Sequence, residues 1–318
     1  MIIISMRVIE WTISSHPLQR VDGHPAPSPA KGEGSAKPIA LKTALWDALD
    51  LISNFRGIDW DWSRDNCMPK ETRPTDSTPT FLAYTALSAL THLALFDTSL
   101  HTFRTISPST FGSPAGGTIF DPTLPPLERY TRSTAMTLLS GIVFYAIIQC
   151  IYDLNTITMI LPFRQKSSRW PPLFDAPWRA TSVANFWGKR WHQLFRSSFV
   201  SIGVKPGSYF AGRAGAVYGA FLVSAILHDW GMWPMARGLQ FSRVGGFFLA
   251  MGLGCILEER SSVKTRGWSG WAWTMLWVVG WGNLLVDAWA RTGLLSGTIF
   301  PDVTAIVIEK LRDVSILD

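Results

Sequence analysis

The sequence is poor in charge, since Asp, Glu, Lys and Arg make up 16% of its 318 residues, whereas average soluble chains carry roughly 25%. Its three cysteines, Cys67, Cys150 and Cys255, lack the paired spacing of a disulfide framework or a zinc site. The first ten residues are apolar but have neither the basic start nor the cleavage site of a signal peptide. The net charge is +6, but the basic residues flank apolar segments and form no separate basic domain, so nucleic acid is not an expected partner.

Apolar and aromatic residues are abundant: 47% of the chain is hydrophobic, and it contains 16 tryptophans, a residue that favours membrane interfaces. The apolar segments expected to cross the membrane are Thr80–Phe96, Thr134–Leu161, Tyr209–Trp230, Val244–Leu257 and Trp268–Trp289. The fourth is short, and its glycines indicate tight packing or a broken helix. We therefore predict an all-α, polytopic membrane protein with about five transmembrane helices. No inverted repeat of the kind found in transporters is visible.

The remaining segments define the expected domain boundaries. Residues 1–39 include a stretch rich in Pro, Gly and Ser and are expected to be disordered. Residues 40–300 form the membrane domain, which begins with a surface helix over Ala40–Phe55, and residues 301–318 form a tail that can be an amphipathic helix. The segment Arg164–Arg196 is the most basic loop and should be cytosolic, together with Lys42–Arg73.

One stretch, Ser182–Arg196, combines aromatic and basic residues with a regular spacing. On a helix, one narrow stripe would contain Asn185, Lys189, His192 and Arg196. The opposite face would contain Trp187, Trp191, Leu194, Phe195 and Ser198. The spacing predicts an amphipathic helix and leaves two interpretations open: a helix that lies in the membrane interface, or one that contributes to an active site.

Two histidines fall within predicted membrane spans. His228 lies near the end of its span, one helical turn after Ser224. An ionisable residue at such a place is a candidate for function, although a histidine can also join two helices by a hydrogen bond. His92 has no accompanying motif, so we expect it to be a satisfied core or pore-facing residue.

Three ordered motifs resemble those of a known family. They are Asn185-Phe-Trp-Gly-Lys-Arg-Trp-His192, Arg56-Gly-Ile-Asp-Trp-Asp-Trp62 and Phe221-Leu-Val-Ser-Ala-Ile-Leu-His228. Together they resemble the wax synthase-like branch of the membrane-bound O-acyltransferases, above all its fungal members, over about residues 45–290. The chain departs from the family pattern at Asp59 and Ala225, where glycine is usual, and in having a linker where members usually have further hydrophobic segments before the first motif.

The resemblance implies which residues act in the reaction. His228 matches the catalytic histidine and would remove the proton of an acceptor hydroxyl. Asn185 or His192 would donate a hydrogen bond to the oxyanion, although His192 could also be a second base or a structural residue. Ser224, Trp187 and Trp191 are candidate substrate contacts, the two tryptophans with packing as the alternative.

The basic residues of the same stretch have two possible roles. Lys189, Arg190 and Arg196 would meet the phosphates of coenzyme A, or they would only anchor the chain at the membrane surface. The resemblance gives no physical role to Arg56, Trp60 and Trp62 beyond an interfacial gate.

The expected function is that of a multi-pass acyltransferase of the endoplasmic reticulum membrane. It would acetylate a hydroxyl of a terpenoid-type secondary metabolite, with acetyl-CoA or another acyl-CoA as co-substrate and no bound cofactor or metal. Membrane lipids are its surroundings, and the oligomeric state is left open. The alternatives are a long-chain wax ester synthase and a non-catalytic membrane scaffold derived from this family.

Overall fold

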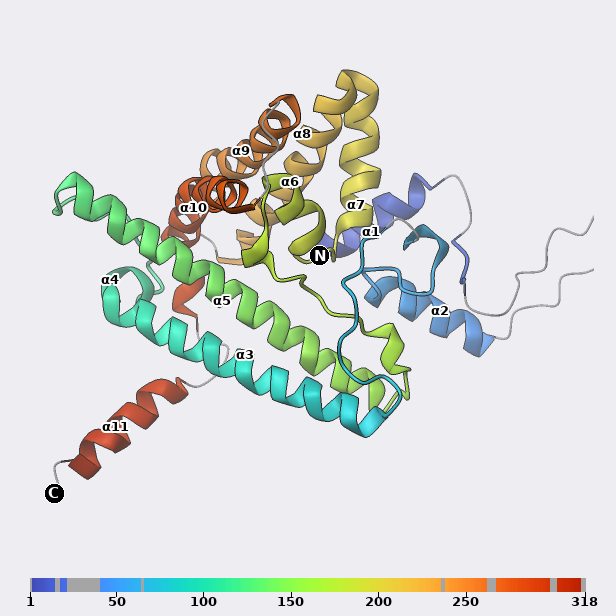
Figure 1. Ribbon diagram of the computed structural model, residues 1–318, viewed down its shortest axis with the longest axis horizontal. Coiled ribbons are helices and arrows are strands. Elements are labelled where there is room, and N and C mark those ends of the chain that lie inside the picture. Colours follow the sequence, from blue (N-terminus) through green and yellow to red (C-terminus); the bar gives the residue numbers. More distant parts are fainter. Residues whose placement is uncertain are drawn as a thin grey trace, which may run out of the picture.

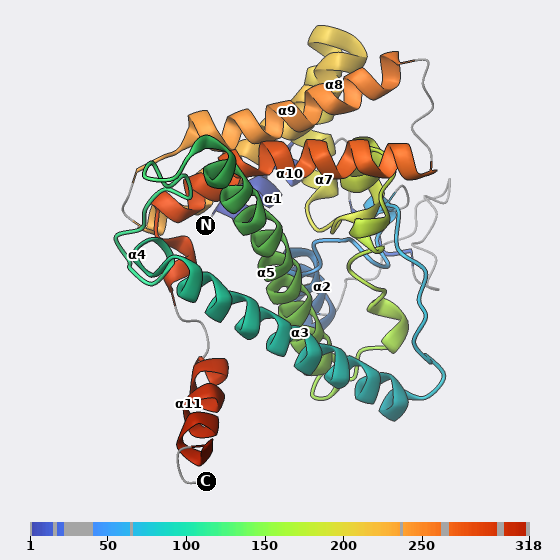
Figure 2. The same cartoon turned by 60° about the vertical axis from the view of Figure 1, so that its left-hand side comes forward.

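The computed structural model describes residues 2–14, 18–21, 41–63, 66–235, 238–261, 267–297 and 302–315. Within these ranges the regular elements are helices, and the β pairing is an isolated antiparallel bridge between Arg20 and Trp60. The predicted all-α class is therefore confirmed. Two long helices, α3 and α5, lie beside a second group formed by α8, α9 and α10 (Figures 1 and 2).

Helices α3 (Thr78–Ile106) and α5 (Pro126–Ile160) form a long pair that runs diagonally through Figure 1. Helix α3 starts at a Ser77 cap with a proline in its first turn, and it ends at Ser107, directly before Pro108. The pair buries large apolar side chains near the α3–α5 connection, among them Phe103, Phe111 and Met136. These contacts determine how α5 meets the second group, where Gly282 of α10 lies against Thr137.

The second group packs α9 (Phe241–Arg260) against α8 (Lys205–Gly231) and α10 (Gly267–Arg291). Its core contains Val244, Phe248 and Met251, which are almost completely buried. Glycines allow the close approach: a β-carbon on Gly254 would collide with the Trp277 indole, and one on Gly252 would crowd Tyr218 and Phe221. The glycines of the expected Val244–Leu257 span therefore mark tight packing, and the helix is unbroken and 20 residues long.

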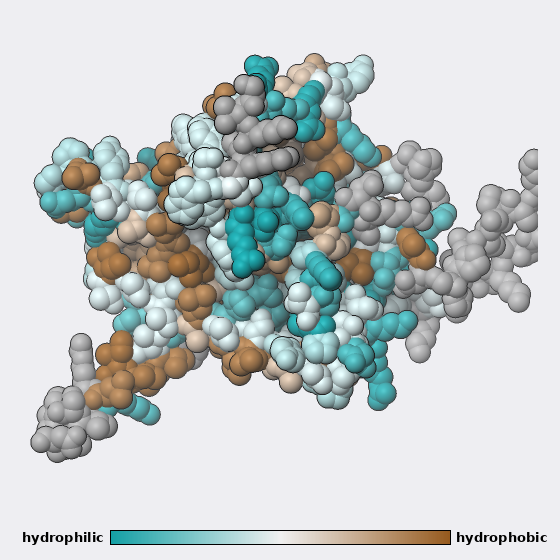
Figure 3. Space-filling model, in the orientation of Figure 1, coloured by the Kyte–Doolittle hydropathy of each residue, from teal (hydrophilic) through white to brown (hydrophobic). Residues whose placement is uncertain are grey.

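Four helical segments are long and apolar enough to cross a membrane in the described part of the chain: α3, α5, residues 196–231 and α9. This confirms a polytopic membrane protein. The fifth expected span, Trp268–Trp289, forms α10 but is not among the four. Its six tryptophans add little to mean hydropathy, although they are typical of a membrane interface. Hydrophobic side chains gather over parts of α3 and α5 on the face shown in Figure 3. Among the exposed apolar side chains of these helices are Leu87, Leu90 and Leu138.

The expected span Tyr209–Trp230 needs a correction, because the helical stretch around it is folded in two. The backbone leaves the helical region at Ala211 and reverses at Gly212, whose φ of 55° favours glycine. Gly203 then lies against Gly219, and Gly207 against Gly215, with backbone touching backbone. Residues 196–210 and 212–231 are therefore the two arms of an antiparallel helical hairpin, which packs through small residues four apart on each arm.

The first residues also differ from the prediction of a disordered segment over 1–39. Helix α1 (Ile2–Thr12) is ordered, and its Arg7 and Glu10 are buried and paired at 3.1 Å. The Glu10 carboxylate accepts hydrogen bonds from Ser197 and Ser198 at the base of the first hairpin arm. These partners are far away in the sequence, which is why local composition did not reveal the helix. The Pro-rich residues 22–40 lie outside the described ranges.

The surface helix expected over Ala40–Phe55 is present as α2 (Leu41–Ser53), with Leu41, Leu45 and Leu49 exposed. The tail forms α11 (Val303–Ser315), whose start is held against α3 because Asp97 accepts hydrogen bonds from Thr304. Both helices present apolar side chains outward, as amphipathic helices at a membrane surface do.

The glycine contacts of the hairpin lead to a stability prediction. We expect Gly219→Ala to lower the melting temperature, because the new methyl group would overlap the backbone of Gly203, and overpacking costs about 1–3 kcal/mol. Gly141→Ala in α5 is the matched control, since nothing lies within 4 Å of its added methyl group. Thermal unfolding in detergent measures both variants, and an equal response would contradict the close glycine contact.

Candidate active site

The stretch expected to form one continuous helix, Ser182–Arg196, is instead a short helical segment followed by an extended turn. It consists of α6 (Val183–Asn185) and a π-helical turn, η4 (Phe186–Arg190). The Trp191 amide donates to the Phe186 carbonyl at 2.8 Å, and Trp191 then becomes extended. The buried Gln193 amide closes the turn by donating to the carbonyl oxygens of Trp187 and Trp191. The predicted stripe is therefore interrupted after Lys189, and His192 and Arg196 do not continue it as they would on a straight helix.

The start of this segment is fixed by a carboxylate from another helix. Glu258 of α9 accepts hydrogen bonds from the backbone amides of Val183 at 2.6 Å and Ala184 at 3.1 Å. It also accepts one from the Trp273 indole of α10 at 2.8 Å, while Ser182 caps the Asn185 amide. A negative charge at a helix start satisfies its free N–H groups and is stabilising. The site segment is thus attached to α9 and α10 together.

The guanidinium of Arg190 fixes the Asn185 side chain. Its Nε donates to Asn185 Oδ1 at 2.7 Å, and its Nη1 donates to the Asp175 carbonyl at 2.8 Å. Arginine is only a donor, so the amide oxygen of Asn185 must face it, and the amide hydrogens face away. The Asn185 side chain is thereby oriented as a donor. Its oxygen accepts from Arg190, and the bond to Ser182 is made by the Asn185 backbone amide.

His228 lies near the end of the second hairpin arm. Its Nδ1 is 2.8 Å from the Ser224 carbonyl oxygen, and its ring packs on Phe248 with centroids 4.6 Å apart. A carbonyl can only accept, so Nδ1 carries the proton, and in the neutral ring Nε2 holds the lone pair. Ser224 thus contributes through its backbone, and its arrangement leaves one nitrogen of His228 available as a base.

The structure brings His192 close to His228. The His192 ring packs on Phe174, and its Nδ1 is buried without a hydrogen-bond partner. Burial, and secondarily the neighbouring His228 imidazole, lower the pKa of His192 to about 3. His192 is therefore neutral at physiological pH. An unsatisfied buried nitrogen beside a candidate base is a group that a substrate can engage.

Trp187 is close to both histidines through shared aromatic neighbours. Its indole packs against Phe221, Phe247 and Phe248, and the last of these also touches His228. Its Nε1 is buried and has no acceptor. Trp191 stacks on Phe186 and lies edge-on to Phe174. Trp187 thus presents a free donor near the candidate base, whereas Trp191 packs.

The basic residues differ in how far they are engaged. The Lys189 side chain is 52% exposed, and its Nζ lies 4.0 Å from Asp175. Arg196 donates to the Gly188 carbonyl and to Gln193, and Arg190 holds Asn185. Of the three, Lys189 has the freest cation.

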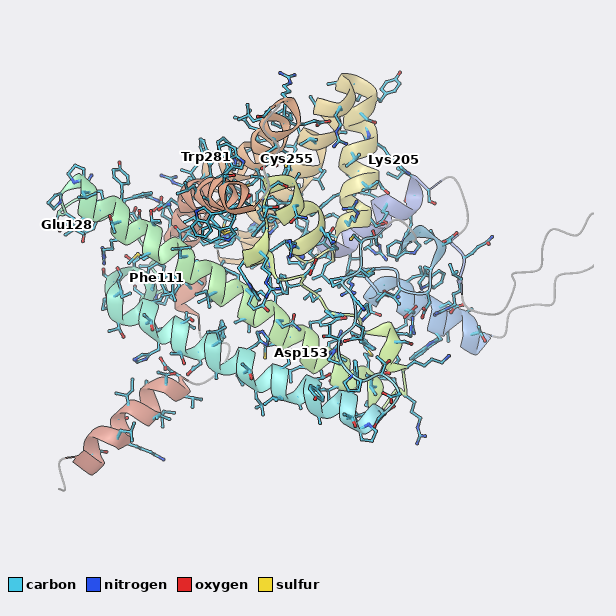
Figure 4. All side chains as sticks on the ribbon, viewed as in Figure 1. Phe111, Glu128, Asp153, Lys205, Cys255 and Trp281 are labelled. Atoms are coloured by element: carbon cyan, nitrogen blue, oxygen red, sulfur yellow. The ribbon has the colours of Figure 1, made fainter. Side chains whose placement is uncertain are left out.

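Sequence reasoning missed the roles of Glu258 and Gln193, which depend on contacts that no motif shows. It also passed over Asp153, labelled in Figure 4, which is fully buried on α5 and accepts hydrogen bonds from Ser88 at 2.6 Å and Gln149 at 2.9 Å. A carboxyl group inside an apolar span was the available signal. The His92 ring beside this cluster bonds the Ser88 carbonyl at 2.8 Å and packs on Tyr145, which confirms a satisfied histidine.

A model of the membrane bound O-acyl transferase family matches residues 170–250. This range contains the Asn185–His192 segment and His228. The chain is thus similar to membrane-bound O-acyltransferases over about a quarter of its length. Its relatives include fungal proteins that are named acetyltransferases.

Two of these relatives are named acetyltransferases. The first, aurG of Calcarisporium arbuscula, is 28% identical over 47% of this chain and 41% of its own length. The second, eriL of Hericium erinaceus, is 24% identical over 81% of this chain and 71% of its own length. The O-mevalon transferase yanI of Aspergillus niger is 25% identical over 73% and 56%. The chain thus spans less than two thirds of aurG and of yanI. No solved structure matches this chain significantly.

The depressed pKa of His192 leads to a prediction about pH. Above its usual value of 6.5, the imidazole is neutral in both the folded and the unfolded chain. Below 6.5 the unfolded chain binds a proton that the folded protein does not, so stability falls as the pH decreases. We expect the melting temperature of the wild type to drop more between pH 7.5 and 5.5 than that of His192→Asn. Equal drops would show that His192 is not held neutral by its surroundings.

Proposed function

We propose that this protein is an O-acyltransferase that transfers an acyl group from coenzyme A to the hydroxyl of a lipophilic acceptor. The observation that carries the proposal is the His228 imidazole, whose Nδ1 is committed to the Ser224 carbonyl, so that Nε2 is left as a base next to neutral His192. The match of residues 170–250 to a model of the membrane bound O-acyl transferase family supports the same reaction class.

The reaction needs one base and one oxyanion site. Nε2 of His228 accepts the proton of the acceptor hydroxyl while the oxygen attacks the thioester carbonyl carbon. The tetrahedral intermediate collapses, the carbon–sulfur bond breaks, and the thiolate of coenzyme A takes the proton from His228. The oxyanion between these steps requires fixed hydrogen-bond donors.

Three groups can supply such donors. The Trp187 indole N–H is buried and unpaired, His192 has an unpaired Nδ1, and the Asn185 amide is oriented by Arg190. The first two lie beside aromatic residues that also surround His228 or its neighbour. We favour Trp187 and His192 as the groups near the oxyanion and Asn185 as a substrate contact farther along the segment.

The acetyl group as the transferred unit is supported by relatives that are named acetyltransferases. We further propose that the acceptor is a terpenoid-type alcohol and that the protein lies in the endoplasmic reticulum membrane. Lys189 is the member of its basic group best placed to meet a phosphate of coenzyme A, because Arg190 and Arg196 already bond to protein groups. A long-chain wax ester synthase is the alternative that the acyl-CoA series described below would reveal.

The catalytic role is tested by two matched histidine variants. In both His228 and His92, the Nδ1–H group donates a hydrogen bond of 2.8 Å to the carbonyl oxygen of the serine four residues earlier. We expect His228→Ala to reduce transfer by about 10²–10⁴-fold, the usual contribution of general base catalysis, whereas His92→Ala should keep transfer within a few-fold. Microsomes are incubated with labelled acetyl-CoA or palmitoyl-CoA and mixed alcohols.

The two variants separate catalysis from structure. Equal losses would mean that the histidines serve only to hold helices together, and transfer that survives in His228→Ala would remove it as the base. Wild-type protein that transfers palmitoyl groups faster than acetyl groups would favour the wax ester alternative. No transfer from either donor would favour the non-catalytic scaffold.

The orientation in the membrane gives a further prediction. Residues 161–182 contact the Arg56 segment and the start of α10, because Arg56 bonds the Pro171 carbonyl and Trp271 bonds that of Trp178. The basic Arg164–Arg169 stretch of this face should therefore be cytosolic. Proteinase K added to sealed microsomes should cleave there and spare the α3–α5 connection, residues 107–125. Cleavage of the α3–α5 connection with protection of the Arg164–Arg169 stretch would show that the protein has the opposite orientation.

A further inference from the structure

The Arg56-Gly-Ile motif forms a rigid turn beside the end of α5. The Asn54 side chain bonds both the amide and the carbonyl of Ile58, which closes the turn. Gly57 has a φ of 64°, and its bare α-carbon lies under the Trp62 indole, where any β-carbon would collide with the ring. The motif thereby fixes the backbone of Arg56, whose side chain extends toward the 171–172 backbone.

Arg56 is a buried cation without a carboxylate partner. It is 4% exposed, and its Nη1 bonds the Pro171 and Pro172 carbonyls at 3.1 and 3.0 Å. Its Nε has no hydrogen-bond partner, and no carboxylate in the described part of the chain forms an ion pair with it. A buried charge is costly unless an opposite charge compensates it.

The neighbouring arginines show that the lack of a carboxylate is particular to Arg56. Each of them contacts an acidic side chain within 3.1 Å, in the pairs Arg20–Asp47, Arg73–Glu71 and Arg169–Asp50. The surroundings of Arg56 therefore keep one positive charge uncompensated, although acidic residues are abundant nearby.

A cavity of about 110 Å³ adjoins this charge. Its wall includes Arg56 together with the polar side chains of Asn54, Tyr152, Asn155, Gln165 and Arg169. The Asp50 carboxylate also lines it, but this group is paired with Arg169 and Arg20. One water molecule needs roughly 10–15 Å³ of such volume, so the cavity can hold a group the size of a phosphate. A cavity with an unpaired guanidinium and several amides matches a small oxyanion.

We propose that this cavity binds a phosphate group of the acyl-CoA. The assignment rests on the proposed acyltransferase function. Leu194 also lines the cavity, and it is only two residues after His192. Leu194, Trp191 and Phe174 belong to one apolar cluster, and His192 packs on Phe174. Coenzyme A carries its phosphates at the end opposite its thiol, on a long flexible arm, so the cavity holds one end while the thioester reaches the histidines.

Direct binding measurements test the assignment without turnover. Purified full-length protein is titrated with coenzyme A and, separately, with pantetheine, which has the same thiol arm and no phosphate. We expect Arg56→Gln to weaken coenzyme A binding about tenfold or more, as for loss of a hydrogen bond to a charged group, and to leave pantetheine binding unchanged. Arg213→Gln is the control, because Arg213 is exposed and paired with Glu259, and neither of these two residues lines the cavity.

A second variant keeps Arg56 and its carbonyl contacts intact. Asn155 is exposed at the cavity wall, and Asn155→Asp adds a negative charge with almost no change of shape. It should weaken coenzyme A binding and spare pantetheine, even if Arg56→Gln fails to fold. Coenzyme A binding that is unchanged in the folded variants, or pantetheine binding weakened as much, would overturn the assignment.

The source of the phosphate and the proposed function are separated by two further outcomes. If the cavity holds a phospholipid headgroup, Arg56→Gln will lose co-purified phospholipid while binding coenzyme A normally, which overturns the assignment to acyl-CoA. Wild-type protein that does not bind coenzyme A would overturn the proposed function together with this site. If the wild type and both cavity variants bind coenzyme A equally well, this site is overturned but the proposed function is not.

Discussion

The contact of bare backbone between the two hairpin arms is the constraint on which the site depends. With Gly203 against Gly219 and Gly207 against Gly215, the arms lie closer than any pair of larger residues would permit. The chain therefore leaves the His192 segment, reverses at Gly212 and returns, so that His228 comes back beside His192. A straight helix over residues 196–231 would carry His228 far from that segment. The side chains of the candidate site are thus positioned by glycines that are not part of it.

Around this hairpin, polar groups hold the site segment from several sides. Glu258 fixes its start, Arg190 fixes Asn185, and Gln193 closes the turn before the first arm. Each of these contacts satisfies backbone or amide groups that would otherwise be unpaired in apolar surroundings. The groups that stay unpaired, Trp187 Nε1 and His192 Nδ1, lie near His228. The satisfied groups form the frame of the candidate site, and the two unsatisfied nitrogens are the ones proposed to meet the substrate.

The sequence predicted the elements whose signal is local. The apolar run ending at Leu161 corresponds to α5, which ends at Ile160, although polar residues extend its start back to Pro126. The sequence motifs and His228 were also recognisable as candidates, and the structure brings His192 and His228 close together. The reversal at Gly212 was not, because Tyr209 and Phe210 keep the run apolar through the turn. The break at Trp191 depends on a π turn and on Gln193, and the order of α1 depends on serines almost 190 residues away. The sequence could not predict that Arg56 lacks a carboxylate partner, because this depends on which residues the fold places around it.

The bonds of Arg56 to the Pro171 and Pro172 carbonyls have a consequence for biosynthesis. The motif leaves the ribosome more than 100 residues before its partners, which follow α3 and α5. Asp50 is likewise synthesised well before its partner Arg169. This face can therefore close only after both long helices have been synthesised. Closure of the face marks the point in synthesis at which the α3–α5 pair is complete.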